Sequence, residues 1–385
     1  MGRNNYYRSN SRKRYRRKTI PHDMYIAKAE EGYIAPSIYV EDKTYEDFHI
    51  CAVLKRNIKK KGYTFPTKIQ DQAIPVILEN KDVLGLASTG SGKTGAFLIP
   101  MLNKIIKDNT QKCLIIVPTR ELASQIQDEF RDLAETTNIY SALVIGGTNI
   151  KRQINKLQRN PQFVIGTPGR LKDLYERRVL KLSTFNNIIL DEVDRMLDMG
   201  FIPDITYLMS KLGKRDQTLF FSATMTRKAE EVANSLLNNP VRIQIEKESS
   251  LKNIDQDVVR YRNPDDKLNV LVELLKKDEF TKVLIFSRTK RGADKLSKKL
   301  FQIGFRANSI HGDKSQSKRS YVLSEFKSNK LDLLVATDVA ARGLDIPNVS
   351  HVINYDEPEN YKDYIHRTGR TGRAGKKGCA LTFVK

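Results

Sequence analysis

The sequence predicts an α/β protein with two domains, each built around a buried parallel sheet. Three observations support this prediction. The chain has 385 residues, which exceeds the size at which one hydrophobic core usually keeps growing. Short apolar runs alternate with longer segments of helical periodicity, a pattern typical of βαβ units. The alternation stops at the polar stretch 246–257 and then restarts, which indicates a second domain of the same kind.

The short apolar runs are the predicted strands. In the first half of the chain they are 83–86, 113–117, 141–145, 163–165, 188–190 and 218–221. In the second half they are 283–286, 307–310, 331–335, 351–355 and 379–384. We therefore divide the chain into a basic, disordered N-terminal tail (1–40), a first domain (41–246), a linker (247–256) and a second domain (257–385).

The charge balance favours a polyanionic partner. The net charge is +22, and we expect nucleic acid ahead of an anionic membrane surface. Residues 1–20 carry eight Lys or Arg residues, no acid and almost no aliphatic residues, which predicts a disordered arm that binds nucleic acid. The same composition would fit an organelle transit peptide, but no amphipathic helical stripe supports that alternative.

The rest of the composition predicts a cytoplasmic protein without a membrane segment. No apolar run approaches the length needed to span a bilayer. The cysteines lie far apart and form no CxxC motif, so we interpret them as reduced thiols rather than disulfide partners or metal ligands. They are Cys51, Cys113 and Cys379.

A glycine-rich loop, ASTGSGKT (87–94), follows the predicted strand 83–86 and leads into a helical segment. This context argues against a chance Gly/Ser loop. The backbone at Gly90 and Gly92 can approach phosphate oxygens, Lys93 can reach the β- and γ-phosphates, and the Thr94 hydroxyl can ligate Mg²⁺. The loop residues predicted to bind ATP are Ser88, Thr89, Gly90, Ser91, Gly92, Lys93 and Thr94.

Carboxylates end the predicted strand 188–190, in the sequence DEVD (191–194). Acidic residues often cap strands, so this tetrapeptide alone decides nothing. A strand-end carboxylate beside a phosphate loop, however, is the usual way to hold Mg²⁺ in enzymes that hydrolyse nucleoside triphosphates. We expect Asp191 to hold the metal through water and Glu192 to orient and deprotonate the attacking water. Ligands bind beyond the carboxyl ends of parallel strands, so two such sheets could share a cleft.

An ordered set of further motifs carries a family resemblance. It comprises GYTFPTKIQ (62–70), PTREL (118–122), Gly146-Gly147, TPGR (167–170), SAT (222–224), VLIFSRTK (283–290), HGDKSQSKR (311–319), TDVAARGLDI (337–346) and HRTGRTGRAG (366–375). With these motifs the chain resembles the DEAD-box ATP-dependent RNA helicases of helicase superfamily 2 over roughly residues 43–385. Val193 replaces the Ala that names the family, and Tyr45 stands where the family usually has Phe. The resemblance implies two tandem RecA-like domains that share an interdomain ATP cleft.

The resemblance also implies roles for residues around the nucleotide. On the first domain, Tyr45, Thr67 and Gln70 would bind adenine, with the Gln70 amide offering a donor and an acceptor. The second domain would supply Asp345 to the ribose and His366 toward the DEVD and SAT motifs. Arg370 and Arg373 would be the arginine fingers, which act on the γ-phosphate when the cleft closes. The catalytic residues implied are Lys93, Asp191, Glu192, His366, Arg370 and Arg373.

The remaining motif residues would couple hydrolysis to RNA. Coupling would run through hydrogen bonds that join Asp194 with Ser222 and Thr224. Small polar groups and exposed amides suit contacts to the sugar-phosphate backbone, which carry no base sequence, and the 2′-hydroxyl would favour RNA over DNA. The RNA-contacting residues implied are Pro118, Thr119, Arg120, Gly147, Thr167, Gly169, Arg170, Arg288, Arg319 and Thr337. We interpret His311 and His351 as structural.

The sequence therefore predicts an RNA-dependent ATPase that uses ATP and Mg²⁺ for local duplex separation or ribonucleoprotein remodelling. An alternative of a different class is an ATP-gated RNA clamp that hydrolyses slowly and nucleates an assembly. A DNA helicase is a weaker alternative. The motifs do not separate these functions. We expect a monomer with RNA as its main partner, ribonucleoprotein proteins as further candidate partners, and no membrane association.

Overall fold

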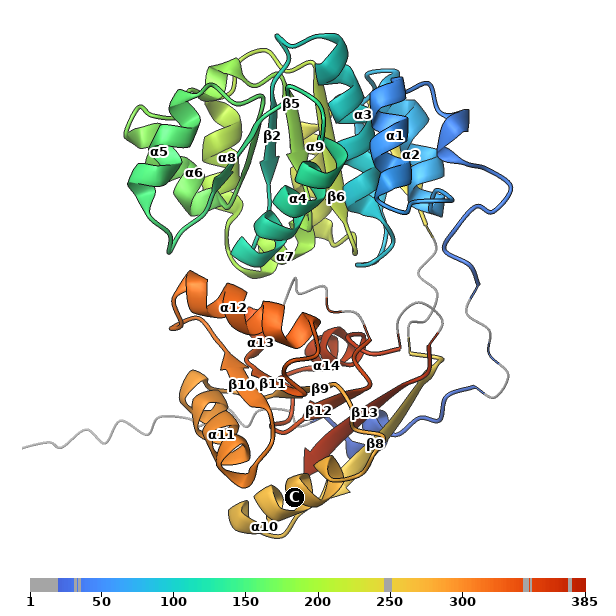
Figure 1. Ribbon diagram of the computed structural model, residues 1–385, viewed down its shortest axis with the longest axis vertical. Coiled ribbons are helices and arrows are strands. Elements are labelled where there is room, and N and C mark those ends of the chain that lie inside the picture. Colours follow the sequence, from blue (N-terminus) through green and yellow to red (C-terminus); the bar gives the residue numbers. More distant parts are fainter. Residues whose placement is uncertain are drawn as a thin grey trace, which may run out of the picture.

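The computed structural model describes residues 20–30, 33, 36–245, 251–341, 346, 348–372 and 376–385. It contains two parallel sheets, each with helices on both faces, one above the other in Figure 1. The prediction of two α/β domains is confirmed. Predictions for residues 1–19, Asp345 and Arg373 concern positions outside the described residues.

The first sheet has seven parallel strands within the described residues, in the order β3-β4-β2-β5-β6-β1-β7. The strands are β1 (Val83–Leu86), β2 (Cys113–Ile116), β3 (Ser141–Val144), β4 (Phe163–Gly166), β5 (Asn187–Leu190), β6 (Gln217–Ser222) and β7 (Val241–Gln244). The helices are η2 (Tyr45–Asp47), α1 (Ala52–Lys60), α2 (Lys68–Leu78), α3 (Lys93–Lys107), α4 (Arg120–Leu133), α5 (Ile150–Gln158), α6 (Pro168–Glu176), η3 (Leu182–Thr184), α7 (Val193–Asp198), α8 (Ile202–Ser210) and α9 (Arg227–Leu236).

The second sheet has six described strands, all parallel, in the order β10-β11-β9-β12-β13-β8. They are β8 (Ile254–Arg260), β9 (Val283–Phe286), β10 (Ala307–Ile310), β11 (Leu333–Ala336), β12 (His351–Asn354) and β13 (Gly378–Val384). The helices are α10 (Pro264–Leu275), α11 (Lys290–Ile303), α12 (Gln316–Lys327), α13 (Asp338–Ala341) and α14 (Tyr361–Thr368).

The central strands are apolar throughout because helices cover both of their faces. In β2, Ile115 packs into the cluster on one face of the first sheet, whereas Leu114 and Ile116 pack into the cluster on the other. The second sheet repeats this arrangement in β9, where Leu284 faces one cluster and Ile285 the other. Strands buried on both faces lose the polar alternation of a half-exposed strand.

Two strands were not predicted from the sequence, and both are sheet edges. β7 and β8 read VRIQ and IDQDVVR, and both carry exposed polar side chains. An edge strand is less covered, so its sequence shows no continuous apolar run. β8 starts at Ile254, inside the range 247–256 that was assigned to the linker.

The expectation of a disordered tail up to residue 40 is wrong for the described part of that range. The short helix η1 (His22–Tyr25) contacts β8 and β13 of the second domain. Tyr39 forms an antiparallel bridge with Thr67 of the first domain. The buried ring of Tyr25 and the backbone bridge at Tyr39 hold this part of the chain against the two domains. The composition of residues 1–20, from which disorder was predicted, does not indicate such contacts.

No helix in the described parts of the chain combines the length and the apolar character needed to cross a membrane.

Candidate nucleotide-binding and catalytic site

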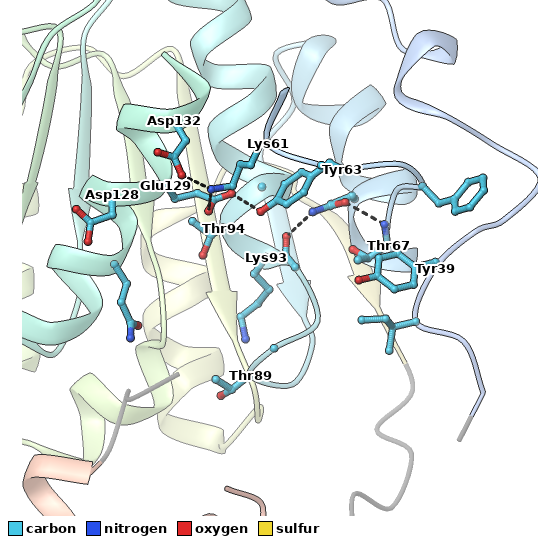
Figure 2. Close-up of a pocket in the computed structure, with 18 of the residues that line it drawn as sticks. Tyr39, Lys61, Tyr63, Thr67, Thr89, Lys93, Thr94, Asp128, Glu129 and Asp132 are labelled. Carbon is cyan, nitrogen blue, oxygen red and sulfur yellow. Dashed lines mark hydrogen bonds and ion pairs between the residues drawn. The ribbon is translucent and has the colours of Figure 1, made fainter. Parts of the chain in front are cut away.

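A cavity of about 640 Å³ opens at the carboxyl edge of the first sheet (Figure 2). Its walls come from the phosphate loop after β1, from Asp191 and Glu192 after β5, and from the segment 61–70 that leads into α2. Lys327 of the second domain also lines it. This volume lies within the range of pockets for small ligands.

The phosphate loop has the backbone geometry of an anion site. Gly90 and Gly92 have φ values of +88° and +92°, the left-handed region that favours glycine. A Cβ at Gly92 would lie 2.6 Å from Thr67 Oγ1, whereas nothing lies within 4 Å of a Cβ at Gly90. The loop ends at the N-terminus of α3, where unpaired N–H groups and the helix dipole favour a negative charge.

Lys93, the first residue of α3, is buried and donates hydrogen bonds to its own loop. Its Nζ lies 2.6 Å from the Ala87 carbonyl oxygen and 3.1 Å from that of Ser88. Thr67 Oγ1, close to this loop, is buried and has no hydrogen-bond partner in the structure. A cationic side chain and an unpaired hydroxyl beside the glycine-rich loop fit a bound triphosphate.

Asp191 is buried at the end of β5, 2% exposed. Burial raises its pKa to about 7; the neighbouring Glu192 adds to the shift, and Lys93 opposes it. A bound cation would favour the ionised form of this carboxylate. The described residues contain no cluster of three or more His, Cys, Asp or Glu side chains able to hold a metal. One carboxylate and the Thr94 hydroxyl fit Mg²⁺, which usually takes few protein ligands besides water and phosphate.

Glu192 is held by an arginine that the sequence reasoning missed. Its φ is +55°, and it precedes the first turn of α7. Arg195 Nη1 lies 2.5 Å from Glu192 Oε2, and both residues are buried. Arg195 Nη2 also reaches Thr89 Oγ1 of the phosphate loop, at 3.5 Å. The spacing i, i+3 of opposite charges at a helix start was the available signal.

Hydrogen bonds link the DEVD and SAT segments. Thr224 Oγ1 donates to Asp194 Oδ2 at 2.9 Å, and the Asp194 backbone N–H donates to Ser222 Oγ at 3.3 Å. Ser222 Oγ in turn donates to the Thr224 carbonyl oxygen. α7 is therefore tied to the end of β6 at the floor of the site.

On the adenine side, Gln70 is already engaged by the protein. Its Oε1 accepts from Tyr45 OH at 2.5 Å and from the Thr67 N–H at 2.9 Å, while its Nε2 donates to the Gly92 carbonyl at 3.1 Å. Tyr45 itself is 5% exposed. That Gln70 recognises adenine stays a prediction. Its Oε1 could accept a hydrogen bond from a base only after losing the bond from Tyr45 OH or from the Thr67 N–H.

Two tyrosines that were not singled out also line this cavity. Tyr63 donates its OH to Glu129 Oε1 at 2.5 Å, which fixes the ring in the wall of Figure 2. Tyr39 lies on the segment that pairs with Thr67. Tyr63 was visible in the motif GYTFPTKIQ, whereas Tyr39 falls outside the family motifs and only its contact with this wall reveals it.

The predicted RNA residues follow neighbouring strands. In the first domain they come after β2, β3 and β4, which are adjacent in the order β3-β4-β2. Arg120 lies against the glycine pair, so a Cβ at Gly147 (φ +73°) would clash with its guanidinium. Thr119 caps α4, and Arg170 pairs with Asp173. The remaining members are Pro118 before α4, with Thr167 and Gly169 at the start of α6.

The second domain repeats this placement. Arg288 follows β9, Thr337 follows β11, and Arg319 lies on α12 after β10; these strands are adjacent in the order β10-β11-β9. The buried guanidinium of Arg319 pairs with Glu121 Oε2 of the first domain at 2.8 Å. Its contact with RNA stays a prediction, and such a contact would compete with Glu121.

The catalytic residues expected from the second domain lie on and after α14. His366 is on this helix, and Arg370 is buried just beyond it. Lys362, at the start of the same helix, pairs with Asp198 at the end of α7 at 2.9 Å. An ion pair therefore connects the helix that carries His366 to the helix that starts from DEVD.

A phosphate loop and a strand-end carboxylate pair, set between two parallel sheets, define a nucleoside triphosphate hydrolase of the RecA-like kind. The family model for DEAD/DEAH box helicases matches residues 67–232, and that for the helicase conserved C-terminal domain matches 266–375. The chain belongs to the DEAD-box helicase family.

Named relatives and solved structures agree with this assignment. The chain is 45% identical to the ATP-dependent RNA helicase CshA of Listeria monocytogenes over 343 residues, covering 89% of this chain and 66% of that protein. It is 42% identical to the Bacillus subtilis CshA helicase over 89% and 69% of the two chains. The chain thus spans about two thirds of the length of these relatives.

Two solved structures serve as references for the domain arrangement. The TM-score is 0.78 against S. cerevisiae Dbp5 bound to RNA and ADP BeF3, at 32% identity over 89% of both chains. It is 0.51 against a DEAD box protein from Methanococcus jannaschii, at 39% identity over 89% of this chain and 93% of that one.

Proposed function

We propose that this protein is an RNA-dependent ATPase that uses ATP hydrolysis to separate short RNA duplexes. One observation carries the proposal: Lys327 of the second domain lines the cavity that contains the phosphate loop and the Asp191–Glu192 pair. Two ion pairs, Arg319–Glu121 and Lys362–Asp198, join the domains. A site divided between two domains responds to their closure. Because ATP and RNA would each prefer the closed state, each would favour binding of the other.

The first domain's residues hold the triphosphate and prepare the water. The amides of Gly90 and Gly92 surround phosphate oxygens, and Lys93 exchanges its loop carbonyls for the β- and γ-phosphates. Thr94 and Asp191, the latter through water, would hold Mg²⁺, which when bound neutralises charge on the phosphates. Glu192 accepts the proton of the attacking water, with Arg195 holding its carboxylate beside the loop.

The second domain completes the site when the cleft closes. Arg370 and Arg373 would neutralise the charge that develops on the γ-phosphate, and Asp345 would contact the ribose. His366 would bridge toward the linked Asp194, Ser222 and Thr224. RNA would lie along the loops after the adjacent strands of both sheets, bound through its backbone.

The comparison structures support an RNA-competent arrangement. The chain is more similar in sequence to the M. jannaschii protein, yet it superposes better on the RNA-bound Dbp5 complex. Because the domain fold is common to all three, the difference favours the domain arrangement of the RNA- and nucleotide-bound relative.

The central test is Glu192→Gln, measured as RNA-stimulated release of phosphate. Loss of a general base should lower the rate of hydrolysis about 10²–10⁴-fold. The variant should still bind RNA in the presence of ATP, and the lifetime of that complex should be unchanged or longer. Asp128→Asn is the matched control, because it removes a carboxylate from another wall of the same cavity. Near-normal turnover in Glu192→Gln would exclude Glu192 as the base.

A second test addresses the composite site. Arg370→Ala should lower RNA-stimulated turnover by about 10³–10⁵ and leave ATP binding to the RNA-free protein nearly unchanged. Turnover within a few-fold of the parent would refute catalysis across the two domains.

Strand separation on a short duplex distinguishes the helicase from an ATP-gated clamp, which would instead stay bound to single strands. Stimulation by RNA and not DNA would exclude the DNA helicase.

A further inference from the structure

Residues 20–30, here called the N-terminal strap, pack on the second domain although they precede the first in sequence. η1 lies beside β8 and β13, in the lower body of Figure 1, where the blue start of the chain meets these strands. Eight residues after Glu30, the chain joins the first domain at Ile38, whose carbonyl oxygen accepts from the Lys68 N–H. Neither family model includes the strap.

Backbone hydrogen bonds attach the strap to the edge of the second sheet. Ala27 and Gln256 exchange two bonds, Ala27 N to Gln256 O at 3.0 Å and Gln256 N to Ala27 O at 2.7 Å. The Glu30 N–H donates to the Lys252 carbonyl at 2.8 Å. β8 is the terminal strand of its sheet, so the strap satisfies groups that an edge strand would otherwise expose.

Tyr25 anchors the strap in the core between β8 and α14. It is 0% exposed, and its ring centroid lies 4.9 Å from that of Tyr364 on α14. The Tyr364 OH donates to Gln256 Oε1 at 2.8 Å, on the same residue that the strap holds through its backbone. Val384 of β13 completes this cluster. Strap, β8 and α14 are therefore locked by one set of contacts.

Asn253, the residue directly before β8, contacts the backbone that follows α14. Asn253 Nδ2 donates to the carbonyl oxygens of Gly372 and Lys376, at 2.7 and 2.8 Å. The backbone thus held begins two residues after Arg370. A strap that fixes Lys252–Gln256 consequently acts on the helix with His366 and on the backbone at Gly372.

We propose that the N-terminal strap positions α14 and the residues 369–372 that follow it for ATP hydrolysis, with Tyr25 as the positioning residue. Tyr25 acts through Tyr364 and Gln256 and touches no nucleotide group. The catalytic consequence rests on the roles proposed above for His366 and Arg370. A shift of about 1 Å in a catalytic group can lower a rate by about 10², so a loosened α14 would slow turnover while the first domain still binds ATP.

The test uses the full-length protein with Tyr25→Ala, measured by RNA-stimulated ATPase kinetics. We expect kcat to fall about 10-fold or more, with the KM for ATP unchanged because the phosphate loop lies in the first domain. Tyr25→Phe should restore wild-type kcat, since the Tyr25 hydroxyl is buried without a hydrogen-bond partner. Ile26→Ala is the matched control, because the next side chain is 50% exposed.

A second variant keeps the proposal testable if Tyr25→Ala does not fold. Ala27→Pro removes the N–H that bonds Gln256 without emptying the core, and it should lower kcat in the same way. Amide exchange should speed up in β8 and α14 in both variants. A folded Tyr25→Ala or Ala27→Pro protein with kcat within about two-fold of wild type would overturn the proposal. If Arg370→Ala left turnover normal, the composite site would fail instead, and amide exchange would still report whether the strap is docked.

Discussion

At the scale of single residues, the hydroxyl of Tyr45 changes what Gln70 can offer to a nucleotide base. A carboxamide oxygen accepts two hydrogen bonds well, and here Tyr45 OH and the Thr67 N–H occupy both positions. The family usually has Phe at this position, which lacks the hydroxyl. We therefore expect Gln70, in its proposed role at adenine, to bind the adenine amino group less strongly than in a relative with Phe at this position.

We predict that Tyr45→Phe raises the preference for ATP over GTP. Releasing one acceptor position allows a hydrogen bond to the adenine amino group, worth about 0.5–1.5 kcal/mol, or roughly 2- to 10-fold. The measurement is the ratio of kcat/KM for ATP and GTP. Tyr63→Phe is the control, because that hydroxyl bonds Glu129 rather than Gln70. An unchanged or lower ratio in Tyr45→Phe would contradict this account, and Gln70→Ala should lower the ratio.

At the scale of elements, Arg367 fastens α14 to its domain. Its guanidinium pairs with both oxygens of Asp338 on α13, at 2.6 and 2.7 Å. It also donates to the Asp356 carbonyl oxygen at 2.7 Å and lies over the Phe286 ring. The side chain is 2% exposed, so these partners replace water for a buried charge. The helix that carries His366 therefore depends on a fixed fork of hydrogen bonds.

We predict that Arg367→Ala destabilises the second domain by about 1.5–3 kcal/mol, because the half-buried carboxylate of Asp338 would lose its charged hydrogen-bond partner. Arg367→Lys should rescue little, since an ammonium cannot reproduce the planar fork. Chemical unfolding measures the loss. Arg291→Ala, an exposed charge on α11 of the same domain, should change stability by no more than about 0.5 kcal/mol. An equally small change in Arg367→Ala would show that the fork contributes nothing.

At the scale of the whole molecule, two groups of charges are distinct: the ion pairs that join the domains and the basic residues near the N-terminus of the sequence. Glu121–Arg319 and Asp198–Lys362 bridge the two domains. Residues 1–19 hold eight Lys or Arg residues and no acid, and they precede the strap. We therefore expect long-range attraction to RNA and interdomain closure to depend on different parts of the chain.

We predict that deleting residues 1–19 weakens RNA binding at low salt and flattens its salt dependence. Each engaged charge on a single strand contributes about −0.7 to the salt slope, so eight contribute at most about −5.6. Turnover at saturating RNA should stay unchanged because the strap and the catalytic groups remain. Titrations at several salt concentrations measure the slope. An unchanged slope would show that this segment does not touch RNA and would favour the transit-peptide interpretation.

Much of this protein follows from the sequence alone. Runs such as those of β2 and β9 are apolar at every position because both faces are covered, and that burial is a local property which periodicity records. The phosphate loop and the DEVD carboxylates also carry their chemistry locally, since each motif sits at a strand end. The sequence did not predict the order of the strands in either sheet. The motifs could still be placed together, because the carboxyl ends of parallel strands lie at one edge of the sheet in any order.

Tertiary structure alone decided the remainder, because the deciding partners lie far apart in the chain. By sequence Tyr25 belongs to a tail, and only its contact with Tyr364 shows that it is part of a core. The first three residues of β8 were assigned to the linker, and only their pairing with β13 and the strap shows that they form a strand. The Tyr45 hydroxyl reaches Gln70 across 25 positions, and Arg319 meets Glu121 across domains. A hydrogen bond or a ring contact requires proximity in space, which neither composition nor periodicity encodes.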